Sequence, residues 1–194
     1  MQRPCPRRQR QTRRRKPRFH LLRVARRIKL NSALNRLCGA PHNGFVVTMV
    51  YGFSRPTGDL DVLEIAPREA GKPMLQLGMQ GGPLHKKYKI YLDPVGVAHV
   101  PENYEDRLTE IFPKSFQHLR LCALDPYDLA LSKLERNIQH DRDDMKYLAR
   151  TVPLDVDVLR QRYQKELRWQ LGNPEREDLT LKLWIDAIEE EKRQ

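Results

Sequence analysis

Alternating and continuous apolar runs predict a mixed α/β domain that begins near residue 45. The β-branched, apolar run Phe45–Tyr51 is typical of a buried strand, and Leu60–Ile65 predicts a second one. Three further strands are expected, at 87–93, 95–100 and 119–124. Residues 31–44 are rich in Asn, Gly and Pro and are interpreted as a linker.

Helical signals dominate the C-terminal third. Asp125 followed by Pro126 predicts a helix start, with Asp128 as the acidic residue of a capping box. Three more helices are predicted: 141–150, 155–171 with a stop at Gly172, and one that starts at Pro174 and enters the 189–192 tail. The expected fold class is α/β (α+β), a small mixed sheet with a C-terminal helical layer.

Charge divides the chain into two parts. Residues 1–58 carry 15 of the 36 Lys and Arg residues and no Asp or Glu, whereas 59–194 hold all 25 acidic residues. Residues 1–18 are nearly all Arg, Gln, Pro and Lys, which predicts disorder, and residues 20–30 have the spacing of a short basic amphipathic helix. The predicted organisation is a basic low-complexity arm and linker, 1–44, followed by one domain, 45–194.

Composition excludes several classes of protein. No apolar run approaches the roughly 18 residues that a membrane span needs, so no membrane partner is expected. Cys5, Cys38 and Cys122 are far apart and form no Cys-x-x-Cys pair, which argues against a disulfide framework and a zinc knuckle. These features favour a cytoplasmic protein.

Two aspartates at the start of a predicted strand are the strongest candidates for chemistry. Asp59 and Asp61 would point to the same face, about 6–7 Å apart at Cα. Two carboxylates on one face can bind Mg²⁺, and two such ions can support an in-line phosphoryl displacement. Arg55 and Thr57 precede them and could hold phosphate oxygens. The pair alone also fits solvated residues at a strand start.

A second charged segment follows the predicted helix start at Pro126. Lys133 and Arg136 are three apart, as on one helix face, and could neutralise phosphate charge. Asp141 and Asp144 have the same spacing on the next helix and could pair with them. The alternative is a helix hairpin with surface salt bridges, each worth under about 1 kcal/mol.

The string Arg55-x-Thr57-x-Asp59-Leu60-Asp61, followed by an apolar strand, resembles the signature of the nucleotidyltransferase superfamily, which has the polymerase-beta-like fold. More narrowly, it is similar to the uncharacterised bacterial branch near the abortive-infection toxin nucleotidyltransferases. The Lys-x-x-Arg and Asp-x-x-Asp elements also come in that family's order, so the resemblance covers about residues 50–194.

This resemblance implies metal-dependent transfer of a nucleotidyl group from a nucleoside triphosphate to an RNA or protein acceptor. Asp59 and Asp61 would hold Mg²⁺, with two ions expected, and Asp93 would be the third carboxylate, either as a third metal ligand or as the general base that activates the acceptor. The residues implied to contact the triphosphate are Arg55, Thr57, Lys133 and Arg136, with Asp141 and Asp144 in support. Without the resemblance, Asp93 equally fits a turn residue before Pro94.

One family feature is missing from the sequence. Members carry a Gly-Gly or Gly-Ser pair that opens a phosphate-binding helix 9–13 residues before the first aspartate, and residues 46–50 contain no glycine. Gly44 lies further back than that spacing. The alternatives are therefore a catalytically inactive scaffold or toxin–antitoxin-type partner, and a nucleic-acid-binding protein that acts through its basic arm.

The origin of the basic arm also stays open at this level. An arm with this charge would attract RNA or DNA, although Phe19 is the single aromatic residue before Phe45. The alternatives are a shifted frame or start that makes residues 1–49 a non-native N-terminus, and an organellar transit peptide.

Overall fold

The computed structural model describes residues 37–41, 44–54, 57–66, 68–95, 98–116 and 119–193. The basic segment 1–36 and Arg55 lie outside the described residues, so the predictions of a disordered arm and of an Arg55 phosphate contact are not tested.

The centre of the fold is a five-stranded sheet in the order β3-β2-β1-β5-β4. Its strands are β1 (Leu37–Pro41), β2 (Asp59–Ala66), β3 (Tyr91–Pro94), β4 (Thr109–Ile111) and β5 (Leu119–Ala123). The pairs β1–β2 and β4–β5 are antiparallel, and the pairs β1–β5 and β2–β3 are parallel. The mixed sheet predicted from the sequence is confirmed.

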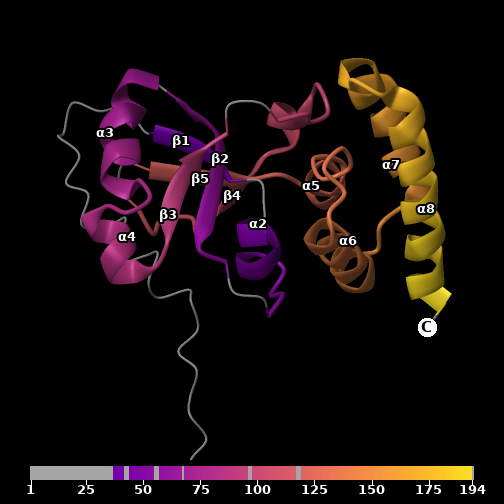
Figure 1. Cartoon of the computed structure of the whole chain (residues 1–194), viewed down its shortest axis with the longest axis horizontal. Helices are drawn as coiled ribbons and strands as arrows, with labels where there is room; N and C mark the ends of the chain where they lie inside the picture. Colours follow the sequence, from indigo (N-terminus) through magenta and orange to yellow (C-terminus); the bar gives the residue numbers. More distant parts are fainter. Residues whose placement is uncertain are drawn as a thin grey trace, which may run out of the picture.

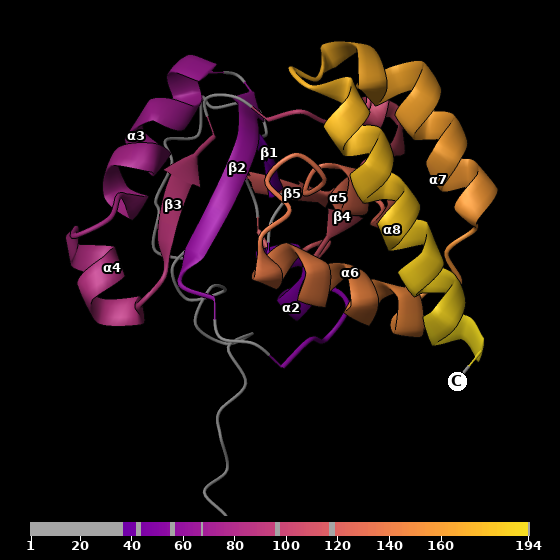
Figure 2. The ribbon, with the colours of Figure 1, turned by 45° about the vertical axis from the view of Figure 1, so that its right-hand side comes forward.

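Helices lie on both sides of this sheet (Figures 1 and 2). The helices are α2 (Gly44–Met49), α3 (Arg68–Gly78), α4 (Pro83–Tyr88), α5 (Pro126–Leu131), α6 (Gln139–Thr151), α7 (Val156–Arg162) and α8 (Pro174–Arg193). A short 3-10 turn spans Tyr104–Arg107, and α7 continues through a π turn at Tyr163–Leu167 and a 3-10 turn at Arg168–Gln170. Helices α3 and α4 lie on one side, and α5–α8 form the predicted C-terminal layer on the other.

Two predictions near the start of the domain are wrong. Strand β1 lies inside residues 31–44, the expected linker, and is the central strand of the sheet. The apolar run expected to be a strand at Phe45–Tyr51 forms helix α2 instead. Four residues of this run are buried: Phe45, Val46, Val47 and Met49. A short run that is buried on every face is apolar at every position, so it has no periodicity that distinguishes a helix from a strand.

The middle of the chain also departs from the predicted strands. The strand expected at 87–93 is confined to Tyr91–Pro94, because α4 extends to Tyr88. The strand expected at 95–100 is absent from its described residues, 95 and 98–100. Helix α3 has no counterpart among the predicted elements, since Gly71 and Pro73 interrupt its sequence.

The predicted helix starts and stops of the C-terminal third are confirmed. The Asp125 side chain caps α5 by accepting a 2.9 Å hydrogen bond from the Asp128 amide. Asn173 caps α8 in the same way, through the Arg176 amide at 3.3 Å. The capping-box role predicted for Asp128 is wrong, because its carboxylate, fully buried, pairs with two arginines instead.

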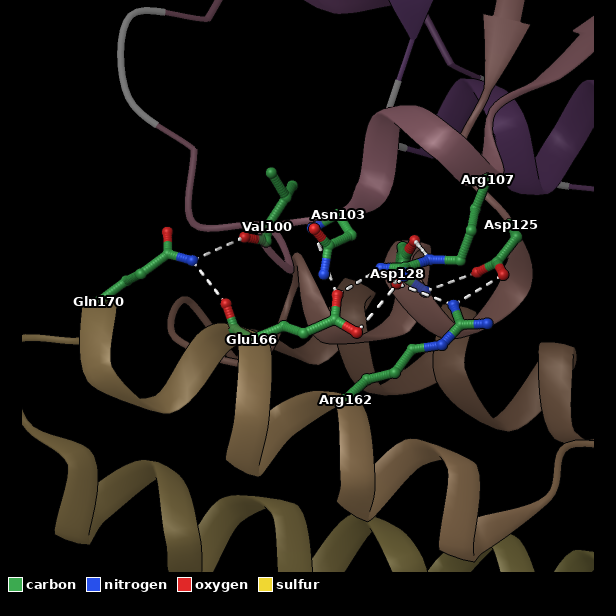
Figure 3. Close-up of polar contacts among 8 residues, drawn as sticks. All are labelled: Val100, Asn103, Arg107, Asp125, Asp128, Arg162, Glu166 and Gln170. Carbon is green, nitrogen blue, oxygen red and sulfur yellow. Dashed lines mark hydrogen bonds and ion pairs between the residues drawn. The ribbon is translucent and has the colours of Figure 1, made fainter.

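That carboxylate is the centre of an ion-pair network between the loop before β4 and the C-terminal helices (Figure 3). Arg107 binds Asp128 at 2.8 Å and Glu166 at 2.7 Å. Arg162 of α7 binds Asp128 at 2.9 Å and Asp125 at 2.7 Å. Burial raises the pKa of Asp128, and the two arginines oppose that increase. The network holds the helical layer against the part of the chain that leads into the sheet.

Candidate functional site

Three carboxylates of β2 and β3 lie on one face of the sheet. Asp59 and Asp61 alternate with the buried Leu60 on β2, so both point away from it. On the parallel neighbour β3, Asp93 is in register with Asp61. Paired strands lie about 4.8 Å apart, so the three side chains form a compact set, called here the acid row (Asp59, Asp61 and Asp93).

The structure adds Tyr91 to this face, a residue that the sequence analysis did not single out. Tyr91 is in register with Asp59, and it is two positions from Asp93 on the same strand. Partial burial raises the pKa of its hydroxyl, and the negative charges of the acid row raise it further. The signal was present in the sequence as the spacing Tyr91-x-Asp93, but its use depends on knowing the register with β2.

Thr57 supports the acid row directly. Its hydroxyl donates a 2.9 Å hydrogen bond to Oδ1 of Asp59. Helix α6 contacts the segment that precedes Thr57. The Tyr147 hydroxyl donates a 3.0 Å hydrogen bond to the Tyr51 carbonyl, and the Tyr147 ring stacks on the Phe53 ring with centroids 4.4 Å apart. Thr57 therefore orients Asp59 in this structure, whereas a contact with a triphosphate stays a prediction.

The Lys-x-x-Arg and Asp-x-x-Asp elements come together as a buried ion cluster. The Lys133 ammonium is 3% exposed and lies 3.0 Å from Oδ2 of Asp144 and 3.7 Å from Oδ1 of Asp141. Arg136 makes a bidentate pair with Asp141, at 2.9 and 2.6 Å. Both aspartates are fully buried, so the surface salt bridges considered as an alternative are not what the structure contains.

The expected placement of the two cations on one helix is also corrected. Helix α5 ends at Leu131, and Lys133 and Arg136 occupy the turns that follow it. The Lys133 ammonium is committed to carboxylates inside the protein. The Arg136 side chain is 55% exposed, so it is the member of the pair that solvent and ligands can reach.

Arg136 connects this ion cluster to the acid row. Its hydrogen bonds with Asp141 raise the pKa of the guanidinium most, and the charge of Asp61 adds to that increase. Asp61 is therefore close enough to Arg136 for their charges to interact. Arg136 is thus an exposed cation whose charge interacts with Asp61 of the acid row.

The donor set suits Mg²⁺ that is shared with a phosphate ligand. Magnesium binds one or two carboxylates and completes its octahedron with water and substrate phosphates, which Asp59 and Asp61 on one face could provide. Within the described part of the chain, no three Asp, Glu, His or Cys side chains are gathered closely enough to hold a metal by themselves.

Two histidines, His85 and His99, have different surroundings in the structure. The His85 ring packs edge-on against Tyr91 at 5.0 Å, and its Nδ1 accepts a 2.8 Å hydrogen bond from the Gly81 amide, so this histidine borders the acid row. His99 instead pairs with Glu135.

No helix of the described residues is long and apolar enough to cross a membrane.

The strand and helix that the resemblance requires before the acid row are present. Strand β1 leads to α2, which begins at Gly44, 15 residues before Asp59. The expectation that the resemblance stops near residue 50 is therefore wrong, although the glycine pair is absent from the residues between Gly44 and Asp59.

Comparison with known families agrees with this boundary. Residues 44–193 match the model of a family described as "Nucleotidyltransferase of unknown function (DUF6036)". No curated protein and no solved structure matches the chain.

Proposed function

The chain belongs to this nucleotidyltransferase family, and we propose that it transfers a nucleotidyl group from a nucleoside triphosphate, with the acid row as its catalytic centre. The observation that carries the proposal is the register of β2 and β3. It brings Asp93, 32 residues away in sequence, beside Asp61 on the face that Asp59 shares.

Each carboxylate has a distinct role in this proposal. Asp59 and Asp61 would hold Mg²⁺, which supplies charge neutralisation at the triphosphate and its leaving group. Asp93 of β3 is the partner of Asp61 in the strand pair, and its side chain is exposed. Its carboxylate can therefore accept the proton of an incoming acceptor hydroxyl. Thr57 holds one oxygen of Asp59 and so fixes the orientation of that carboxylate.

Positive charge in the site is assigned to Arg136 rather than to Lys133. The guanidinium of Arg136 is exposed and near Asp61, so it can stabilise negative charge that develops on a bound phosphate. Lys133 neutralises Asp141 and Asp144, and these two aspartates hold Arg136 in place. The acceptor is an RNA or a protein hydroxyl.

Calorimetric titration of the full chain with ATP and then GTP, each with and without Mg²⁺, tests the proposal. The full chain is needed because a fragment from residue 45 would lack β1, the central strand. The test variant is Asp59→Asn/Asp61→Asn. Its matched control is Asp106→Asn/Asp186→Asn, which removes the same charge from exposed positions elsewhere.

We expect Mg²⁺-dependent nucleotide binding in the wild type and in the control, and its loss in the test variant. Binding that survives in the test variant would refute the assignment of the acid row. Absence of binding in the folded wild type would instead favour the inactive scaffold or toxin–antitoxin-type partner, and circular dichroism of each protein establishes that it is folded.

A further inference from the structure

A basic surface lies on α4 and the residue after it, next to Tyr91 of β3. Residues 70–92 contain four lysines and no Asp or Glu, within a region, 59–194, where acidic residues outnumber basic ones by 25 to 21. The surface consists of His85, Lys86 and Lys87 on α4 and of Lys89 directly after α4, and it is called here the α4 basic surface.

The charges of Lys86, Lys87 and Lys89 are available to a ligand. The side chains of these three lysines are exposed. Among the residues that the structure describes, Lys86, Lys87 and Lys89 form no ion pair with a carboxylate, and Lys87 lies over the Tyr88 ring at 5.3 Å. This differs from the arginines of the C-terminal helices, several of which are paired with acids.

The α4 basic surface contacts the sheet at Tyr91, a neighbour of the acid row on β3. His85 packs against Tyr91, which is in register with Asp59. Lys89 comes two residues before Tyr91, and the Tyr91 amide donates a 2.9 Å hydrogen bond to the Gly58 carbonyl, one residue before Asp59. A phosphate backbone bound on α4 would therefore pass Tyr91, the residue in register with Asp59.

Lys89 occupies a defined backbone position at the end of α4. Lys89 caps α4 in the left-handed conformation, with φ of 59°, and its amide donates to the His85 carbonyl at 2.8 Å. Glycine or asparagine is preferred in this conformation. A lysine there places a cation at the end of β3 that is nearest to the paired residues Tyr91 and Asp59.

We propose that the α4 basic surface binds the phosphate backbone of a single-stranded nucleic acid and directs its end to the acid row. The inference rests on the proposed function and narrows its acceptor from an RNA or protein hydroxyl to a nucleic acid. It concerns the folded domain and is separate from the basic segment 1–36.

A nucleic acid fits this surface better than an anionic membrane does. Leu77 and Met79 are exposed nearby, at 47% and 55%, but α4 is only six residues long and offers no broad apolar face to a bilayer. Cations spaced along a helix and the following turn match a chain of phosphates, and their position beside the acid row suits a polymer whose end is the reactive group.

The test is the salt dependence of binding to a fluorescein-labelled 20-nucleotide single-stranded RNA of mixed sequence, by anisotropy, without nucleotide or Mg²⁺. The full-length test variant is Lys86→Gln/Lys87→Gln/Lys89→Asn. The control is Lys114→Asn/Lys165→Gln/Lys182→Gln, at exposed sites on the β4–β5 turn and the C-terminal helices. Each variant loses three charges and puts Asn at one left-handed position, because Lys114 has φ of 63°.

In the test variant, we expect the slope of log affinity against log salt concentration to become less steep by about 2. Each phosphate contact with a single strand contributes about 0.7 to this slope, and the variant removes three of them. The affinity should fall by roughly 100-fold at 0.1 M salt, and the control should stay within about threefold of the wild type. Equal weakening in the two variants, or none in either, would overturn the proposal.

Two further measurements separate the remaining outcomes. Loss of binding to vesicles that contain anionic phosphatidylserine, with RNA binding unchanged, would assign the surface to a membrane and refute the proposal. Asp59→Asn/Asp61→Asn should keep RNA binding while it loses Mg²⁺-dependent nucleotide binding. Failure of the nucleotide site and failure of the RNA surface are thereby measured independently.

Discussion

Replacing Lys133 with methionine tests whether the buried ammonium belongs to the fold or to a nucleotide site. The side chain is 3% exposed and lies 3.0 Å from Asp144 and 3.7 Å from Asp141, two fully buried carboxylates. Methionine has nearly the same length and removes only the charge. Lys133→Met therefore leaves two buried carboxylates with Arg136 as their one remaining cationic partner among the residues of this ion cluster.

The magnitude follows from these distances. At an effective dielectric constant of about 20, each pair attracts by roughly 4–6 kcal/mol, and the cost of removing the ions from water offsets much of this. Removal of one partner of a buried pair typically costs about 3–5 kcal/mol, because the other charge stays buried. For a protein of this size that loss lowers Tm by roughly 6–20 °C.

Urea unfolding followed by circular dichroism measures this loss, and Mg²⁺-nucleotide titration of the same variant provides the second readout. Lys133→Met/Asp144→Leu removes both partners and should recover part of the lost stability. An unfolding free energy within about 1 kcal/mol of the wild type, together with lost nucleotide binding, would refute the structural role and restore Lys133 as a phosphate ligand.

Three further predictions follow from individual contacts. Burial alone would raise the pKa of Asp141, but the hydrogen bonds from Arg136, the charges of Lys133 and Arg136 and the Ile138 amide together outweigh burial, and the pKa is lowered. The contribution of Asp141 to stability is thus complete above the unfolded-state pKa of about 3.9 and is lost as pH falls further, and Asp141→Asn should flatten the acid side of the urea-unfolding profile. A Cβ on Gly78 would lie 2.5 Å from the Leu92 side chain, so Gly78→Ala should lower the unfolding free energy by about 1–2 kcal/mol. A Cβ on Gly172 would have no atom within 4 Å, so Gly172→Ala should stay within about 0.5 kcal/mol of the wild type in the same assay. Equal effects of the two substitutions would contradict this packing. Tyr147→Phe keeps the ring but removes the hydrogen bond to the α2–β2 loop, and thermal unfolding should show a loss of about 0.5–1.5 kcal/mol, with no loss contradicting the contact.

Local patterns were sufficient where the signal is confined to a few neighbouring residues. The cap at Asp125, the start of α8 after Asn173 and the shared face of Asp59 and Asp61 depend on the chemistry of one turn or one strand. The family resemblance depended on the same kind of local string and holds over residues 44–193.

The fold around residue 45 shows where local patterns fail. Residues 45–51 are β-branched and apolar, yet α2 forms there because the sheet receives its central strand from residues 37–41 instead. Burial on all sides makes every position apolar, so the pattern carries no period that would distinguish helix from strand. Only the pairing of β1 with β2 and β5 decides between them.

The sequence by itself determined the mixed α/β class, the C-terminal helices and the Asp59–Asp61 pair. The tertiary structure decided which distant groups join that pair, since strand register brings Asp93 and Tyr91 beside it. It also decided that Lys133 is buried among aspartates while Arg136 reaches solvent, although the two residues have the same local spacing signal. Register and burial depend on contacts between segments far apart in the chain, and no local pattern encodes them.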